Sequence, residues 1–99
     1  MVIKVMDYVE KCYSNSDGEI IFNIINKAFK ESNKIIVSFE GVTSLNSSFV
    51  NSAFIELLDK YDFSIIQEKI QFKDSTSQIN RIIKERFNFE VSRKELAFA

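Results

Sequence analysis

The chain has 99 residues, of which 45% are hydrophobic and 27% charged, and this composition is typical of one soluble globular domain. Its 13 basic and 14 acidic side chains give a formal charge of -1, so no overall field attracts nucleic acid or an anionic membrane. The chain contains no histidine, which excludes Ser-His and Cys-His nucleophile pairs and imidazole metal sites. We therefore expect a protein that is not an enzyme and that uses no metal or cofactor.

Cysteine and glycine usage narrows the function classes further. Cys12 is the single cysteine, so the chain forms no intrachain disulfide and no thiolate zinc site, and a reducing, cytoplasmic location is expected. The two glycines, Gly18 and Gly41, are too few for a phosphate loop or a dinucleotide-binding fingerprint. The longest uncharged run, residues 41–55, is rich in Ser and Asn and shorter than the roughly 20 apolar residues that span a bilayer. No membrane segment is expected.

The first half of the chain predicts a strand, a helix and a second strand. Val2–Val5 is a short β-branched run, and the mixed stretch Tyr8–Tyr13 is a candidate further strand or irregular edge. Residues 14–18 (Ser-Asn-Ser-Asp-Gly) break the pattern and offer capping side chains. Apolar residues then recur at three- and four-residue steps over Ile21–Phe29, which predicts a helix. Lys34–Phe39 is compact and β-branched, as expected for a central strand covered on both faces.

The second half predicts a helix, a strand and a third helix. The cluster Asn46-Ser47-Ser48 offers N-caps for a helix whose apolar stripe ends near Tyr61. Alternation predicts a strand over Lys69–Lys73, and residues 74–77 cap a helix whose buried face ends at Phe87. Strands that alternate with helices indicate a single α/β domain with at least partly parallel pairing. Its core is expected over residues 2–87, with residues 88–99 as a tail.

The segment from Ile35 to Phe54 carries the most distinctive motifs: Glu40-Gly41-Val42 after the strand, Ser47-Ser48-Phe49 at the helix start, and Ala53-Phe54. With Tyr13 and Asp17-Gly18 upstream, it resembles the STAS domain of anti-sigma factor antagonists and, more closely, the STAS-like family of bacterial and phage proteins. The resemblance covers roughly residues 2–87. It implies an α/β fold with a mixed sheet of about four strands and about three helices, and a protein-binding regulator without enzymatic activity.

The resemblance also implies a candidate site. In anti-sigma factor antagonists, the second Ser of an Asp-Ser-Ser-Gly motif is phosphorylated by the partner kinase, a histidine-kinase-like ATPase. Ser48 matches that Ser, while Asn46 stands in place of the Asp and Phe49 in place of the Gly. The expected partner-binding or phosphorylation residues are Gly41, Thr43, Asn46, Ser47, Ser48 and Phe49. Asn46, Ser47 and Ser48 are also ordinary helix caps, and that interpretation stays open beside the regulatory one.

Other features predict packing or association. Cys12 is expected to be a small buried apolar residue and not a reactive thiol. Four apolar residues near the C-terminus exceed what one small sheet covers and predict a partner surface or a homodimer: Phe89, Val91, Leu96 and Phe98.

Two other function classes stay open at this point. One is a small phage or mobile-element inhibitor that binds and blocks a host defence effector, and the other is an enzyme that relies on carboxylates alone.

Overall fold

Three strands form one parallel sheet. The computed structural model describes residues 1–97, with the side chains of residues 1–93. The strands are β1 (Val2–Lys4), β2 (Ile35–Ser38) and β3 (Ile70–Lys73), and β2 lies between the other two. Both pairings are parallel. The predicted central strand is therefore confirmed, whereas the expectation of a mixed sheet of about four strands was wrong for the described part of the chain.

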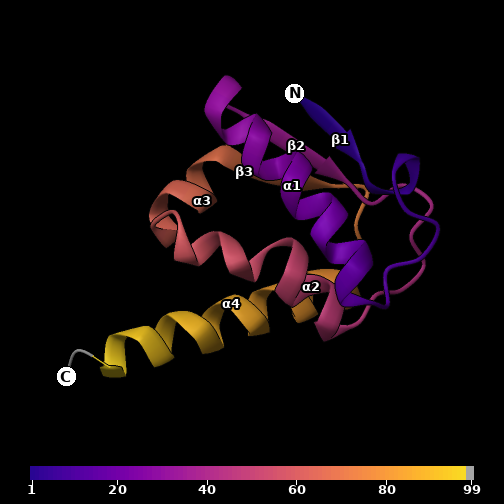
Figure 1. Ribbon diagram of the computed structural model, residues 1–99. Coiled ribbons are helices and arrows are strands. Elements are labelled where there is room, and N and C mark those ends of the chain that lie inside the picture. The colour runs from indigo at the N-terminus through magenta and orange to yellow at the C-terminus, as the bar shows by residue number, and fades with distance from the viewer. Residues whose placement is uncertain (98–99) are drawn as a thin grey trace.

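The helices cover one face of this sheet (Figure 1). The crossover from β1 to β2 contains α1 (Asn15–Glu31), and the crossover from β2 to β3 contains α2 (Ser47–Ala53) and α3 (Phe63–Lys69). Two right-handed crossovers that proceed in the same direction place their helices on the same side. Burial agrees, because alternate strand residues such as Ile3 and Val37 are fully buried.

The opposite face of the sheet is open to solvent. Val2 is 59% exposed, its register partner Ile36 is only half-buried, and Gln71 in the same row is exposed. The expectation that Lys34–Phe39 is covered on both faces was therefore wrong. Both crossover connections lie on one side, and among the described residues no further element follows on the other side.

The first helix, α1, begins earlier than the periodicity predicted. The Ser14 hydroxyl caps it by accepting a hydrogen bond from the Asp17 amide at 3.1 Å. One turn later, Gly18 meets the backbone of α2, where an added Cβ would lie 2.7 Å from both the Phe49 carbonyl oxygen and the Ser52 Cβ. The Asp17-Gly18 motif thus marks the close crossing of two helices, which only a residue without a side chain permits.

The helix predicted to start at the caps in residues 46–48, with an apolar stripe that ends near Tyr61, is interrupted. It consists of α2 and a 3-10 helix, η2 (Ile55–Asp59), separated at Phe54, whose backbone angles are φ -123° and ψ -42°. The Phe54 ring is fully buried and contacts the rings of Phe39, Phe49 and Phe72, with centroids 5.2–6.2 Å away. The short helix α3 then occupies residues for which the sequence predicted no helix. The described chain consequently has four α-helices where about three were expected.

The last helix, α4 (Ser77–Ala97), takes in most of the residues expected to form a tail. Its first turn is capped by the Thr76 hydroxyl, which accepts a hydrogen bond from the Ile79 amide at 3.1 Å. The helix packs mainly against α2 and η2. Its far end projects from the body of the molecule (Figure 1), which measures 41 Å along its long axis and 28 and 23 Å along the others. No helix in the described part of the chain is both long and apolar enough to cross a membrane.

Candidate functional site

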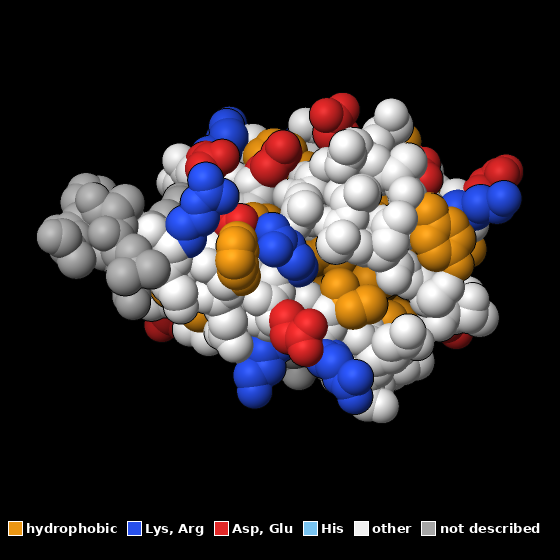
Figure 2. Space-filling model, turned by 90° about the horizontal axis from the view of Figure 1, so that it is seen from below, with side chains coloured by type: hydrophobic (Ala, Val, Ile, Leu, Met, Phe, Trp, Pro, Cys, Tyr) orange, Lys and Arg blue, Asp and Glu red, His pale blue; other side chains and the backbone are white. Residues whose placement is uncertain are grey.

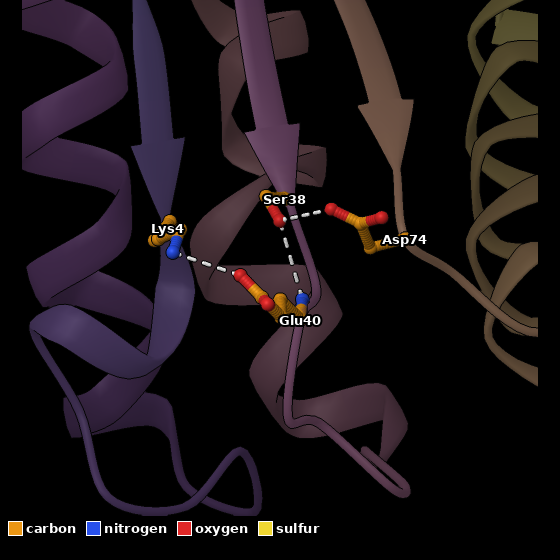
Figure 3. A network of polar contacts seen from close by, with 4 residues as sticks. All are labelled: Lys4, Ser38, Glu40 and Asp74. Atoms are coloured by element: carbon orange, nitrogen blue, oxygen red, sulfur yellow. Dashed lines mark hydrogen bonds and ion pairs between the residues drawn. The ribbon is translucent and has the colours of Figure 1, made fainter.

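Polar side chains connect the carboxyl ends of the three strands (Figure 3). Because the strands are parallel, their carboxyl ends meet at one end of the sheet, the place where α/β proteins commonly bind ligands. Lys4 Nζ, at the end of β1, lies 2.8 Å from Glu40 Oε2. The Ser38 hydroxyl, at the end of β2, donates to Asp74 Oδ2 at 2.8 Å and accepts from the Glu40 amide at 3.3 Å.

These contacts hold the strand ends together, and they occupy the polar groups that could otherwise react with or bind a ligand. Ser38 is only 2% exposed, and its hydroxyl is satisfied both as donor and as acceptor. The hydrogen bond and the charge of Glu40 raise the pKa of Lys4, so Lys4 stays protonated and is no base near neutral pH. Sequence reasoning missed this cluster. The available signal was a polar residue at or just after the end of each strand.

Two loops beside the carboxyl ends of the strands present exposed aromatic and aliphatic side chains. Met6, Tyr8 and Tyr13 belong to the connection between β1 and α1 and are 38%, 47% and 49% exposed. Gly41 and Thr43, two of the predicted site residues, are exposed in the loop after β2. Both line a hollow of about 270 Å³ together with Met6 and Tyr13. We call Met6, Tyr8, Tyr13, Gly41 and Thr43 the loop surface.

Asn46 holds these loops to the start of α2. Its side-chain oxygen accepts a hydrogen bond from the Phe49 amide at 3.0 Å, which makes Asn46 the N-cap of the helix. Its side-chain nitrogen donates to the Tyr13 carbonyl at 2.8 Å, and its own amide donates to the Cys12 carbonyl at 3.2 Å. The Tyr13 hydroxyl in turn contacts the Ser44 hydroxyl. Asn46 therefore both begins α2 and fixes the position of the loop that carries Tyr13.

The two serines after Asn46 are not caps. Ser47 is exposed and Ser48 is half-buried, and neither hydroxyl forms a hydrogen bond with a residue that the structure describes. Phe49 is different, because its side chain is fully buried and packs edge-on against the Phe54 ring at 6.2 Å. The expectation that Phe49 belongs to a partner-binding surface is corrected accordingly: its ring is a core residue.

Cys12 lies beneath the loop surface in a buried position. Burial, reinforced by the negative charge of Asp17, raises the pKa of its thiol to about 11. The thiolate that reacts with electrophiles or binds metals is therefore scarce at neutral pH. The described residues also contain no group of three or more His, Cys, Asp or Glu side chains arranged to hold a metal ion.

The projecting end of α4 carries part of the predicted self-association surface. Phe89 is 56% exposed, although the guanidinium of Arg86 lies over its ring at 5.2 Å, and Val91 is half-buried. The side chains of Leu96 and Phe98 lie outside those that the structure describes. In Figure 2, which views the molecule from the side of α4, hydrophobic side chains form separate patches between acidic and basic ones. Self-association through this helix stays a prediction.

Comparison with known proteins identifies one similarity. A family model described as a STAS-like domain of unknown function matches residues 17–80. The matched stretch runs from the first turn of α1 to the first turn of α4, so it contains the Gly18 crossing, the loop after β2 and all of α2. No curated protein and no solved structure matches the chain.

Proposed function

Because the chain belongs to the family of STAS-like domains of unknown function, we propose that it is a protein-binding regulatory module that contacts its partner through the loop surface. The observation that carries this proposal is the exposure of Met6 and Tyr13, which line one hollow, and of Tyr8, which lines the hollow beside it. Tyrosine and methionine are enriched at protein interfaces, and tyrosine is one of the residues that most often dominate binding energy. The module itself catalyses no reaction in this proposal.

The loops that form the loop surface are held in fixed positions, as expected for a preformed interface. Asn46 holds the Tyr13 backbone, and Gly41 turns the loop after β2 with a left-handed φ of 83°. A second hollow of about 440 Å³, lined by Tyr8, Lys11, Asp17 and Ile20, continues the surface over the start of α1. A preformed surface loses little conformational freedom on binding, so more of its contact energy appears as affinity.

Ser48 is the residue through which we propose that binding is regulated. Its hydroxyl has no hydrogen bond with a described residue and lies in the first turn of α2, where the backbone amides favour a negative charge. A phosphate on Ser48 would thus be tolerated by the fold while it adds charge and bulk beside the loops. By analogy with anti-sigma factor antagonists, the proposed kinase and partner is a histidine-kinase-like ATPase.

The experiment compares which proteins the chain retains from its native host. Immobilised wild type is compared with the double variant Tyr8→Ala, Tyr13→Ala by quantitative mass spectrometry. The matched control is Ile65→Ala, which removes a side chain of similar exposure (38%) from α3. We expect one protein to be retained by wild type and control and to be depleted at least about tenfold by the double variant, because hot-spot residues contribute more than about 1 kcal/mol each.

Melting temperatures serve as the folding control. Each variant should differ from the wild type by no more than a typical surface mutation does. Equal retention by the double variant would contradict the loop surface as the interface. The identity of the retained protein decides between a host regulator and a blocked defence effector. Once the partner is known, Ser48→Asp should weaken binding and Ser48→Ala should not; equal affinity of both would contradict the regulatory role of Ser48.

A further inference from the structure

The outer edge of β3 is unpaired in the described part of the chain, because β3 pairs only with β2. In a parallel ladder, alternate residues of a strand bond to the same neighbour. The Lys73 carbonyl faces the β2 side, where it accepts a hydrogen bond from the Phe39 amide at 2.9 Å. The amide and carbonyl of Phe72 therefore point away from β2. An edge of this kind can accept a further strand from another polypeptide.

An apolar groove runs along this edge, between α3, β3 and α4. Its volume of about 460 Å³ falls in the range of roughly 300–1,000 Å³ that is usual for binding sites. Its apolar walls are formed by Phe63, Ile66, Ile70, Phe72, Ile83 and Phe87. The groove is present because α4 packs mainly against α2 and η2, which leaves the flank of β3 uncovered. Phe63 and Phe87 stack with ring centroids 5.3 Å apart and join α3 to α4.

The charge of the groove distinguishes between possible occupants. Lys84 is the one charged side chain among its described lining residues, and Lys84 forms no ion pair with a described residue. Pairing of β3 with β3 of a second copy would bring two grooves, and with them two Lys84 ammonium groups, together. An acidic segment of another protein instead gains an ion pair at the same place.

We infer that this edge groove binds an extended acidic segment of another protein. The segment adds a strand beside β3 by hydrogen-bonding to the Phe72 backbone. Its apolar side chains enter the groove between Phe63 and Ile83, and one of its carboxylates pairs with Lys84. β1 and β3 are opposite edges of the sheet, so the groove can be occupied independently of the loop surface near the end of β1.

The test uses the full chain labelled with ¹⁵N and the peptide acetyl-Glu-Val-Glu-Phe-Glu-Glu-amide, whose Val, Phe and last Glu lie on one face of an extended strand. Amide shifts are followed by NMR during titration. We expect saturable shifts in β3, α3 and the middle of α4, with a dissociation constant below about 1 mM. Methylation of alternate peptide nitrogens preserves the side chains but removes the donors of one strand edge, so the peptide methylated on the pairing edge should bind at least about tenfold more weakly.

Variants of the chain test the two remaining features of the groove. Lys84→Glu should weaken the peptide about fivefold or more, whereas Lys60→Glu, on the exposed end of η2, should not. Asn80→Trp fills the groove from an exposed position on α4 and should abolish the shifts in β3. Each variant is compared only if its melting temperature matches that of the wild type.

The outcomes that overturn the inference are distinct. Absence of saturable shifts in β3 at millimolar peptide, or equal binding of both methylated peptides and the parent, excludes strand addition. Unchanged affinity of Lys84→Glu excludes the acidic segment. A free chain that sediments as a dimer with its β3 amides protected from exchange assigns the edge to a second copy instead.

Discussion

The crossing of α1 and α2 at Gly18 provides a quantitative test of the fold. Gly18→Ala adds one methyl group, which would lie 2.7 Å from the Phe49 carbonyl oxygen, 2.7 Å from the Ser52 Cβ and 3.1 Å from the Ala53 amide nitrogen. Two of these three neighbours are backbone atoms and cannot rotate away. The two helices must therefore move apart, and the core between them loses contacts.

The magnitude follows from two opposing terms. Alanine in place of glycine inside a helix stabilises by about 1 kcal/mol, whereas overpacking costs about 1–3 kcal/mol. Contacts this short with backbone place the cost near the upper end, so the net loss is about 2 kcal/mol. For a domain of this size, that loss lowers the melting temperature by roughly 8–16 °C.

The assay is thermal and urea unfolding followed by circular dichroism. Glu19→Ala, at the exposed neighbouring position, is the control and should change stability by less than about 0.5 kcal/mol. Ser52→Gly removes one of the close atoms but also the Ser52 hydrogen bond to Asn15, so the double variant should lose less stability than the sum of the two single losses. A Gly18→Ala protein as stable as the wild type, or more stable, would refute the close crossing and with it the structural role assigned to the Asp17-Gly18 motif.

Four further predictions concern the cap of α2, the central strand, the buried cysteine and the end of α4. Asn46→Ala should lower the free energy of unfolding by about 1–2 kcal/mol, and Ser48→Ala by less than about 0.5 kcal/mol; equal losses in urea unfolding would contradict the assignment of the cap. Val37→Asp should abolish the cooperative unfolding transition, since it places a carboxylate in a fully buried position of the central strand; a soluble, cooperatively folded variant would disprove the strand assignment. Cys12 should be alkylated much more slowly in the native chain than in urea at pH 8. Because folding raises the pKa of Cys12 from 9.0 to about 11, the stability difference between the wild type and Cys12→Ala should be constant below pH 9.0, and the wild type should lose stability relative to the variant as pH rises from 9.0 to about 11. Deletion of residues 89–99 should convert a dimer into a folded monomer; a full chain that sediments as a monomer at high concentration would contradict association through the end of α4.

Local sequence patterns determined the parts of the fold that depend on neighbouring residues. The β-branched run ending at Phe39 predicted the central strand, and three- and four-residue spacing predicted α1. Capping residues predicted where α2 and α4 begin, and Asn46 and Thr76 are the caps. The same kind of signal extends beyond Phe87. Ile79, Ile83, Phe87 and Val91 recur every four residues, which continues α4 into the stretch interpreted as a tail.

The motifs that carry the family resemblance were also readable, but the role of each was decided by its surroundings. Ser48 and Phe49 are neighbours in the sequence, yet one lies half-buried in the first turn of α2 and the other is completely buried. In the sequence, Gly18 marks a break between elements and belongs to one motif of the resemblance, but neither feature predicts a helix crossing. Its actual neighbours, Phe49 and Ser52, lie more than thirty residues away along the chain, and no local pattern contains that distance.

Only the tertiary structure decided how the elements meet. The interruption at Phe54 coincides with an aromatic cluster drawn from α2, β3 and Phe39, the residue after β2, and such packing overrides the helical preference of a single segment. The network of Lys4, Ser38 and Asp74 exists because parallel pairing brings the carboxyl ends of three distant strands together at one end of the sheet. The groove beside β3 depends on α4 packing against α2 instead of the sheet. Each of these features depends on which surfaces are buried against one another, and periodicity within one element indicates that a face is buried without indicating what covers it.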